Sequence, residues 1–446
     1  MLPENFGDRN IRIIGLGYVG LTLAVSMAEA GFQVHGIEIN PDILAALGES
    51  RAHFAEYGLN DRLAAQIEKQ RFTFSSSMAN APEASVFIVT VGTPIGSDKK
   101  TNSNALATVT GDIAAVMKQG DLVVLRSTVK VGTTSTFVRP ILEATGKVFD
   151  LAFCPERTLE GRALAELVSL PQIVGGITEH ATFRASQLFS MLTPTIIRVR
   201  NAETAELVKL VNNTQRDLMF AFANEVAALC DATGVSAHEV IASGNIGYAR
   251  ANLPMPGPVG GPCLEKDPYI LAEGLQPLGF VPEIALTGRR WNENLPERAI
   301  GQVADAYARA GGKAPSRIAI LGLAFKGRPE TDDLRGTMAI PIIAALRAHF
   351  PEAEIVGWDA EVSADSLATL GIIACDSPVT ATRGASLVIM QNNHPALEKL
   401  KLSDLAGEMQ APGMIYDFWN QHARLEDHNL APAIRYAALG ALNVRK

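Results

Sequence analysis

Short apolar runs alternate with segments of helical composition in the first and last parts of the chain. The runs lie at 11–14, 33–38, 84–91 and 121–126, and again at 317–321, 354–359, 386–390 and 414–417. Mostly apolar runs of this length are typical of strands buried on both faces of a parallel sheet, with helices as crossovers. We therefore predict an α/β fold with two Rossmann-like, doubly wound domains.

The middle of the chain has helical periodicity instead. Residues 202–233 contain neither proline nor glycine, and Gly234 follows as a helix-ending residue. A second helical stretch runs from 282 to 310, and the segment before the glycine-rich stretch at 257–261 is irregular. We predict a central helical domain that joins the two α/β domains. The chain of 446 residues is too long for one ordinary core, and the predicted domains are 1–201, 202–310 and 311–446.

Composition and charge indicate which classes of binding partner the protein can have. The chain is 47% apolar and 19% charged, with a formal net charge of −8. A negative balance disfavours nucleic acid, while a small anionic ligand needs only a few local cations. No apolar run approaches the roughly 20 residues of a membrane-spanning helix, and the first ten residues lack a signal-peptide pattern. We expect a small-molecule substrate and no membrane partner.

The cysteines are few and dispersed. The chain has four, Cys154, Cys230, Cys263 and Cys375, and none forms a CxxC pair. This spacing argues against a disulfide framework and against a zinc site. We therefore expect no metal and a reducing compartment, the cytoplasm.

The first apolar run leads into a dinucleotide-binding pattern. Gly15-Leu-Gly17-Tyr-Val-Gly20 precedes a helical segment, and Glu38 follows about 20 residues later. In this βαβ context Gly15 makes the turn, Gly17 admits the pyrophosphate, and Gly20 lets helix and strand pack. Glu38 can accept a hydrogen bond from a ribose 2′-hydroxyl and would repel a 2′-phosphate, so we predict NAD as cofactor. The alternative is a doubly wound domain that binds no dinucleotide.

Polar residues follow the later strands of the first domain. Thr93 and Thr128 come after apolar runs, and the carboxyl ends of parallel strands are where an open α/β sheet binds ligand. We expect them where nicotinamide and substrate meet, or alternatively as strand-end caps. Another loop places Glu156, Arg157 and Glu160 together.

One cysteine is presented by a glycine-rich turn. Gly257-Pro-Val-Gly260-Gly-Pro-Cys263 is followed by Asp267. Because glycines admit close approach of a ligand and positive φ, Cys263 is a candidate nucleophile. The alternative is a buried packing cysteine, since free cysteine is often buried.

Two polar residues share a face of the predicted central helix. Lys209 and Asn213 lie one turn apart, and the neighbours of Lys209 are apolar. From these residues alone a solvated helix lysine is the favoured interpretation; the alternative is a partly desolvated ammonium, whose pKa burial would lower.

The turn that opens the third domain differs from the first. Gly322-Leu-Ala-Phe-Lys326 has one glycine where the first turn has three. It predicts a Rossmann relative that holds something other than a dinucleotide. Lys326 and Arg335 can meet phosphates, and the alternative is a structural domain with surface cations.

In this order the motifs resemble the UDP-glucose/GDP-mannose dehydrogenase family of nucleotide-sugar dehydrogenases, nearly end to end. The resemblance rests on GLGYVG at 15–20, Ser127-Thr128-Val129, Pro155-Glu-Arg157, Ala205-Glu206 with Lys209 and Asn213, Gly260-Gly-Pro-Cys263 with Asp267, and Gly322-Leu-Ala-Phe-Lys326.

The resemblance implies a four-electron oxidation of a sugar C6 alcohol to the carboxylate, with two NAD and one water. Cys263 would attack the intermediate aldehyde, and the thiohemiacetal would become a thioester that water hydrolyses. The resemblance also implies that Lys209 and Asn213 stabilise oxyanions and that Asp267 and Thr128 position water or shuttle protons. Glu156 and Glu160 would line the site, with Glu160 as candidate acid or base.

The resemblance further implies a homodimer formed through the central helices, with Arg250 reaching the partner's pocket. The implied cofactor-binding residues are Gly15, Gly17, Tyr18, Val19, Gly20, Glu38, Thr93, Thr128 and Arg335. The implied substrate-binding residues are Arg157, Lys209, Asn213, Arg250, Asn252, Gly260 and Lys326.

Within the family, the residues around the cysteine are similar to those of members that act on UDP-N-acetylhexosamines, above all UDP-N-acetyl-D-mannosamine, for surface polysaccharides. Pro262, Lys266 and Glu160 depart from that pattern, and no arginine follows Asp417 closely. UDP-N-acetylglucosamine and UDP-glucose therefore stay as alternative substrates. Two rival functions also stay open: a two-electron dehydrogenase of the hydroxyacid type, which needs no thiol, and a catalytically silent nucleotide-sugar-binding protein.

Overall fold

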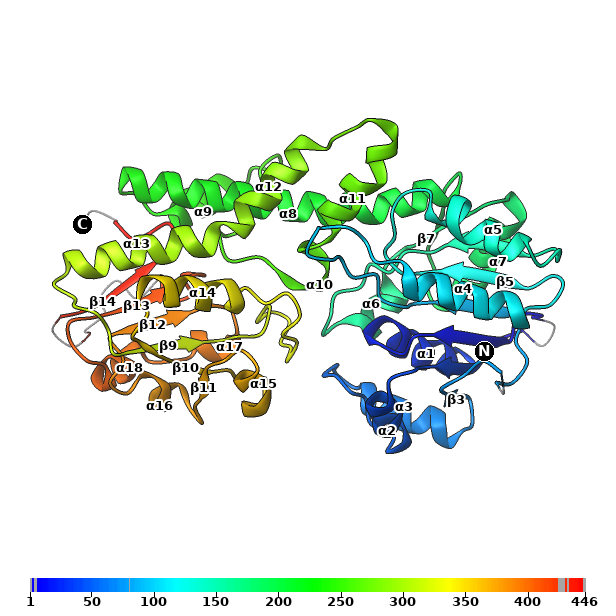
Figure 1. The fold of residues 1–446 in the computed structure, drawn as a ribbon, viewed down its shortest axis with the longest axis horizontal. Helices are drawn as coiled ribbons and strands as arrows, with labels where there is room; N and C mark the ends of the chain where they lie inside the picture. The colour runs from blue at the N-terminus through cyan, green and yellow to red at the C-terminus, as the bar shows by residue number, and fades with distance from the viewer. Residues whose placement is uncertain (1, 4–5, 80, 424–429, 431–432, 444–446) are drawn as a thin grey trace. The chain divides into compact units, whose positions relative to one another are not determined.

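The computed structural model describes residues 2–3, 6–79, 81–423, 430 and 433–443. The chain divides into two compact units, one of Met1–Asn213 with Tyr269–Pro282 and one of Thr214–Pro268 with Glu283–Lys446. Helix α8 (Ala202–Thr233) begins in the first unit and ends in the second (Figure 1). None of the described helices is long and apolar enough to cross a membrane.

The first unit is built on a sheet with eight strands in the described residues, ordered β3-β2-β1-β4-β5-β6-β7-β8. All neighbours are parallel except β6 and β7. The strands are β1 (Asn10–Ile14), β2 (Gln33–Ile37), β3 (Phe72–Ser75), β4 (Val86–Val89), β5 (Leu122–Leu125), β6 (Asp150–Phe153), β7 (Gln172–Gly176) and β8 (Ile196–Arg198).

Helices cover both faces of this sheet, because successive strand residues point to opposite sides. Ile13 and Ile88 belong to one core cluster, and Ile14 and Val89 to the other. The first cluster includes α1 (Tyr18–Ala30), α3 (Leu59–Glu68), α6 (Ala163–Ser169) and α7 (Glu179–Phe189), and the second includes α4 (Asn104–Val116), α5 (Arg139–Glu143) and the start of α8. The unit also contains α2 (Pro41–Gly48) and the π-helical turn η1 (Thr134–Val138). Its returning segment contains all but the first two residues of α11 (Asp267–Leu275) and the 3-10 turn η2 (Gln276–Leu278).

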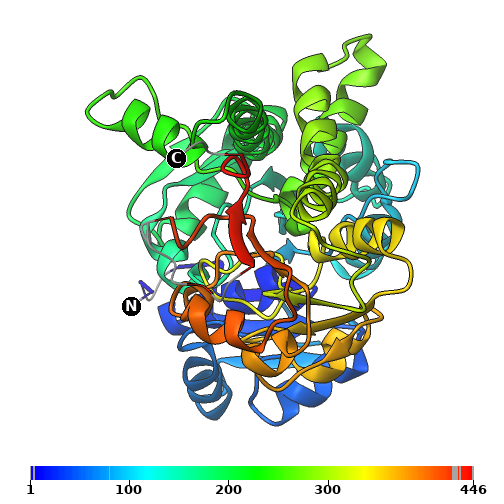
Figure 2. The same cartoon turned by 90° about the vertical axis from the view of Figure 1, so that its left-hand side faces the viewer.

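The second unit contains a parallel sheet with six strands in the described residues, ordered β11-β10-β9-β12-β13-β14. Figure 2 shows this sheet in yellow to red with helices beside it. The strands are β9 (Arg317–Leu321), β10 (Glu354–Trp358), β11 (Ile373–Ala374), β12 (Leu387–Met390), β13 (Gly413–Asp417) and β14 (Ile434–Ala438).

Two core clusters again flank the sheet. Ile318 and Ile320 face the cluster that contains α13 (Leu295–Arg309), α14 (Ala339–His349) and α15 (Ala364–Ala368). Ala319 and Leu321 face the cluster that contains α16 (Pro378–Thr382), α17 (Pro395–Glu398) and α18 (Leu402–Glu408). The remaining helices of this unit are α9 (Ala237–Asn245), α10 (Gly261–Leu264) and α12 (Glu283–Glu293).

The predicted fold class is confirmed: two doubly wound sheets, parallel except for the β6–β7 pair, and a helical middle. Two local features differ from the sequence-based prediction. The stretch at 282–310 is two helices, and Pro296 lies in the first turn of the second one, where its missing N–H is tolerated. The predicted glycine-rich turn that carries the cysteine contains one helical turn, α10, which the sequence analysis did not predict. The domain boundaries at 201/202 and 310/311 stay a prediction.

Candidate functional site

The turn between β1 and α1 has the geometry that a dinucleotide needs. Gly15 has a φ of +90°, and a Cβ atom at position 20 would lie 1.8 Å from the Gly15 carbonyl oxygen. Glu38, at the end of β2, accepts a hydrogen bond from the Leu16 amide at 2.8 Å and so fixes the turn. Gly17 caps α1 without a side chain, which leaves open space before the first amides of the helix. The chain fits a pyrophosphate here.

The loops after β4 and β5 lie side by side. The Thr93 hydroxyl donates to the Thr128 carbonyl oxygen, and the Ser127 hydroxyl donates to the Val91 carbonyl oxygen at 2.6 Å. Thr93 is buried, while Thr128 is half-buried. The structure therefore brings the two predicted threonines together at the carboxyl edge of the sheet, the edge at which this fold binds ligands.

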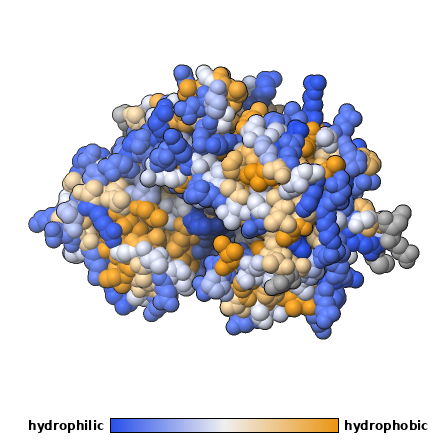
Figure 3. All heavy atoms as spheres, turned by 45° about the vertical axis from the view of Figure 1, so that its right-hand side comes forward, coloured by the Kyte–Doolittle hydropathy of each residue, from blue (hydrophilic) through white to orange (hydrophobic). Residues whose placement is uncertain are grey.

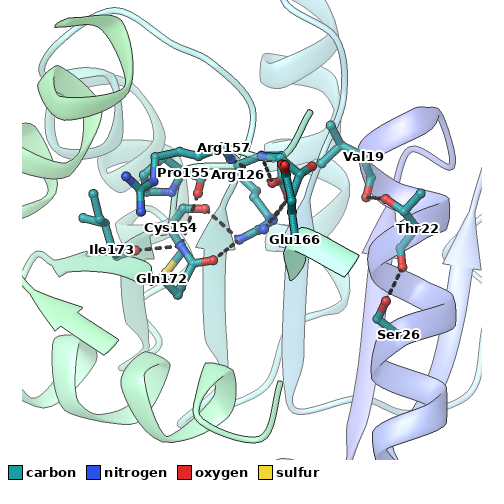
Figure 4. A network of polar contacts seen from close by, with 12 residues as sticks. Val19, Thr22, Ser26, Arg126, Cys154, Pro155, Arg157, Glu166, Gln172 and Ile173 are labelled. Carbon is teal, nitrogen blue, oxygen red and sulfur yellow. Dashed lines mark hydrogen bonds and ion pairs between the residues drawn. The ribbon is translucent and has the colours of Figure 1, made fainter. Parts of the chain in front are cut away.

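Glu156 is held by a buried arginine that sequence analysis did not single out. Arg126 pairs with one Glu156 carboxylate oxygen, and the other accepts from the amides of Arg157 and Thr158, both at 2.7 Å. Arg126 also donates to Gln172 at 2.8 Å, and Figure 4 shows these two side chains meeting. Burial alone would raise the pKa of Glu156, but the Arg126 charge and the amide hydrogen bonds lower it. Glu156 therefore stays ionised, with both oxygens engaged.

Lys209 lies beside the same loop. Its Nζ donates to the Glu156 carbonyl oxygen at 2.5 Å, and the residue is buried, so the interpretation as a solvated lysine is wrong. Asn213, one turn further along α8, is also buried. Helix α8 thus places an ammonium against the backbone of the Glu156 loop.

The end of that loop is tied to the dinucleotide turn. The Gly161 amide donates to the Tyr18 hydroxyl at 2.9 Å and to Glu56 at 2.8 Å, and the Tyr18 hydroxyl donates to Glu56 at 2.5 Å. Burial and the Glu56 carboxylate raise the pKa of Tyr18. Glu160 therefore sits in a loop fixed at its start by Glu156 and at its end by Tyr18.

A second buried acid, Glu206 on α8, holds the loop after Thr128. It accepts from the Gly132 amide at 2.6 Å and from the Thr134 amide at 2.8 Å. Burial raises the pKa of Glu206 to about 7, although these hydrogen bonds favour the ionised form. Glu206 belongs to the sequence motif of α8, but its partners lie far from it in the chain.

In the second unit, the cysteine turn packs against the turn after β9. The Gly261 amide donates to the Gly336 carbonyl oxygen at 2.8 Å. A Cβ atom at position 260 would lie 2.2 Å from that oxygen, and one at position 261, where φ is +88°, would lie 2.5 Å from the Phe325 ring. The Cys263 residue is exposed, whereas Asp267 is fully buried. Close packing of the glycines thus leaves the cysteine presented, as predicted, and rules out a buried packing role.

The turn after β9 carries the predicted cations. Gly322 has a φ of +77°, and the amides of Leu323 and Ala324 donate to Asp359 at 2.5 and 3.0 Å. Lys326 is half-buried, with Nζ 5.1 Å from the centroid of the Phe325 ring. The other predicted cations of this unit are exposed: Arg335, which pairs with Asp333, and Arg250, which follows α9. Asn252 is exposed as well.

One cluster in the described residues has the composition of a metal site. Glu330, Glu361 and His394 each offer a ligand atom, all within 4.8 Å of one another. However, Nδ1 of His394 accepts a hydrogen bond from the Ala396 amide at 3.0 Å. In the neutral ring the proton is then on Nε2, which faces the carboxylates as a donor and cannot coordinate a cation.

These features define the class: an NAD-dependent dehydrogenase with one sheet for the dinucleotide and a second sheet for a phosphate-bearing substrate. The chain matches three domain models of one family, over residues 9–193 (NAD binding domain), 203–294 (central domain) and 319–424 (UDP binding domain). The chain belongs to the UDP-glucose/GDP-mannose dehydrogenase family. It is a nucleotide-sugar dehydrogenase that uses NAD and takes a UDP-sugar.

Known relatives extend over almost the whole chain. A UDP-N-acetyl-D-mannosamine dehydrogenase from Pyrococcus horikoshii is 32% identical over 407 residues, covering 90% of this chain and 93% of the relative. A solved UDP-D-ManNAc dehydrogenase structure from Pyrococcus horikoshii has a TM-score of 0.87 at 30% identity, covering 98% and 100% of the two chains. A UDP-glucose dehydrogenase structure from Pyrobaculum islandicum has a TM-score of 0.85 at 26% identity, covering 99% of each.

Proposed function

We propose that the protein oxidises the C6 alcohol of a UDP-N-acetylhexosamine, UDP-N-acetyl-D-mannosamine first, to the uronate for surface polysaccharide synthesis. The observation that carries the proposal is the exposed Cys263, presented by glycines packed against Gly336 and Phe325. The mannosamine-type relatives support the substrate. UDP-glucose is the second candidate, since a UDP-glucose dehydrogenase structure is also similar.

A thiol explains how one site performs two oxidations. Each oxidation transfers one hydride from C6 to the nicotinamide of NAD. The first converts the alcohol to the aldehyde, which has no tetrahedral carbon to yield a second hydride. The Cys263 thiolate adds to the aldehyde carbon and forms a thiohemiacetal, whose oxidation leaves a thioester. Water then attacks the thioester, which releases the carboxylate and returns the thiol.

The oxygen at C6 carries developing negative charge in the addition and in the hydrolysis. In the proposal the Lys209 ammonium and the Asn213 amide stabilise it. Burial of both side chains supports this role, because a desolvated cation acts more strongly than a solvated one. Thr128 and Asp267 position the hydrolytic water.

We assign proton transfer to Glu160 rather than to Glu156. A general acid or base must give up and take up a proton during the cycle. The ion pair with Arg126 and two amide donors hold Glu156 ionised. Glu156 then orders the loop, and Glu160 carries the proton.

The proposal includes the partners of the site. In the proposal Lys326 binds the diphosphate of the substrate, Arg157, Asn252 and Gly260 also bind the substrate, and Arg335 binds the cofactor. Val211, Phe222 and Leu229 are exposed apolar residues at helical spacing on one face of α8, which supports a homodimer through the central helices with Arg250 from the partner. The space-filling view shows apolar patches within a largely hydrophilic surface (Figure 3). Dispersed cysteines support a cytoplasmic location.

The test is the amount of NADH formed per mole of sugar consumed, at saturating NAD. The substrates are UDP-N-acetylmannosamine, UDP-N-acetylglucosamine, UDP-glucose and GDP-mannose. The thioester route predicts two NADH per sugar and release of the uronate, and Cys263→Ser should abolish uronate release. One NADH per sugar would contradict the route and favour a two-electron dehydrogenase, and no NADH with any of them would favour a silent binding protein.

A further inference from the structure

A buried polar network packs behind the cysteine turn in the second unit. Its members are Asp217 and Asn224 on α8 and Arg289 and Asn292 on α12, each at most 1% exposed. An Arg289 nitrogen lies 2.8 Å from an Asp217 carboxylate oxygen. Burial of a charged pair carries a desolvation penalty, and well-packed apolar residues are often as stable in its place. The pair therefore needs an explanation other than stability.

The contacts of this network converge on the turn. Arg289 donates to the Leu264 carbonyl oxygen at 3.1 Å and to the Val259 carbonyl oxygen at 3.2 Å. These two carbonyls stand on either side of Cys263 in the chain. The network thus holds the backbone both before and after the cysteine.

The side chains of Asn224 and Asn292 also hold the backbone of the cysteine turn. Asn224 accepts from the Gly257 amide at 2.9 Å and donates to the Gly257 carbonyl oxygen at 3.0 Å, as a neighbouring strand would. Asn292 donates to Asp217 and accepts from Asn224. The start of the turn is therefore fixed by the same connected group.

We propose that Arg289, oriented by Asp217, is a positioning residue that sets the attack geometry of Cys263. The inference rests on the proposed thioester route. One planar guanidinium serves a carboxylate and two carbonyls at once, and a lysine ammonium has no such fixed fork. Because a misplacement of about 1 Å can lower a rate about 100-fold, a turn released by Arg289 loses the reaction that depends on the thiol.

Two half-reactions separate positioning from folding. Oxidation of the 6-aldehyde of the UDP-sugar with NAD needs the thiol, because the aldehyde must first become a thiohemiacetal. Reduction of the same aldehyde with NADH transfers a hydride directly and needs no thiol. If a smaller fraction of a variant is folded, aldehyde oxidation and aldehyde reduction fall by the same factor. If Cys263 is displaced in a folded variant, only the oxidation falls.

The experiment supplies the 6-aldehyde to purified Arg289→Lys with NAD and, separately, with NADH. We expect aldehyde oxidation to fall about 100-fold while aldehyde reduction is retained. The matched control is Arg290→Lys, since Arg290 is the next residue of α12 and is exposed; both activities should match the parent. If Arg289→Lys does not fold, the double variant Asp217→Asn with Arg289→Met removes both charges and avoids a lone buried one.

Two results would overturn the positioning role: an equal fall in both activities, or no fall in either. Cys263→Ser distinguishes this failure from failure of the proposed function. If Cys263→Ser still oxidises the aldehyde, the thioester route is wrong. If Cys263→Ser cannot oxidise it but Arg289→Lys does so at the parental rate, only the positioning role is wrong.

Discussion

The two Rossmann-like sheets share their strand order and also one hydrogen bond in the turn after the first strand. Both have the same strand pattern, β3-β2-β1-β4-β5-β6 in the first and β11-β10-β9-β12-β13-β14 in the second. In each, an acid after the second strand holds the amides of the turn: Glu38 that of Leu16, and Asp359 that of Leu323. The framework that places a ligand at the carboxyl edge is therefore common to both.

The sheets differ in the segment that comes after the turn. Helix α1 starts at Tyr18, directly after Gly17, so its first amides and its dipole are available to a phosphate. After β9 the next helix, α14, starts only at Ala339, and the intervening segment carries Lys326 and Arg335. In our proposal the shared topology places a phosphate at the same edge of both sheets, and this local segment determines whether backbone amides or cationic side chains bind it.

The largest expected effect comes from the glycine that lets α1 start so early. Gly20→Val would place Cβ 1.8 Å from the Gly15 carbonyl oxygen, so the helix must move away from β1. We expect a loss of more than about 3 kcal/mol of unfolding free energy together with loss of NAD binding. Thermal unfolding and NADH fluorescence titration measure the two effects.

Gly17→Ala is the control for this prediction. A Cβ atom at position 17 meets nothing within 4 Å, so the stability should stay parental while NAD affinity falls. A parental unfolding temperature for Gly20→Val would show that the early helix start does not depend on that glycine.

The next effect concerns buried acids that hold loops at the ligand edge. Glu206 does so in the first unit, and Asp417, which accepts from the Trp419 and Gln421 amides, does so in the second. Burial raises the pKa of both, that of Glu206 to about 7 from an ordinary 4.5. The native state then binds the Glu206 proton more tightly than the unfolded chain, so its contribution to stability is full below about pH 4.5 and is lost as pH rises to about 7.

Glu206→Gln removes this dependence. We expect the difference in unfolding free energy between parent and variant to change by up to about 3 kcal/mol between about pH 4.5 and 8. Urea unfolding across that range measures it, with Glu225→Gln, at an exposed position of the same helix, as control. If the unfolding free energies of parent and Glu206→Gln change with pH in parallel, the hydrogen bonds from Gly132 and Thr134 keep this acid ionised. The stability of its loop would then be insensitive to pH.

The smallest expected effect tests whether the second sheet binds phosphate with a cationic side chain. Lys326→Met removes a charge-assisted contact, so UDP should bind about 30-fold more weakly, equivalent to about 2 kcal/mol. NAD affinity should not change, because Lys326 belongs to the other sheet. Calorimetric titration with UDP and with NAD measures both, and Lys313→Met, at an exposed position before β9, is the control. An equal loss of NAD affinity would contradict the assignment of UDP to the second sheet and NAD to the first.

Local patterns explain why most of the fold was predictable. The buried strands are mostly apolar, and α8 has the predicted bounds because residues 202–233 lack helix breakers and Gly234 ends them. The dinucleotide turn was predictable for the same reason, since its glycines are close together in sequence.

The supports of the candidate site were not predictable, because each joins distant parts of the chain. Arg126 follows β5 and pairs with Glu156, and Arg289 on α12 pairs with Asp217 on α8. A single charged residue beside an apolar run signals burial but does not identify its partner. The sequence therefore indicates which residues meet a ligand better than which residues hold them.

Helix α8 has a consequence for how the chain folds. Its 32 residues form one cooperative ladder of hydrogen bonds, yet Asn213 ends its part in the first unit and Thr214 begins its part in the second. Melting either part removes a packing surface from one core and frays the helix that supports the other. We therefore expect the two units to unfold in one transition, and we expect a chain cut within α8 to yield two halves that each lack a complete core.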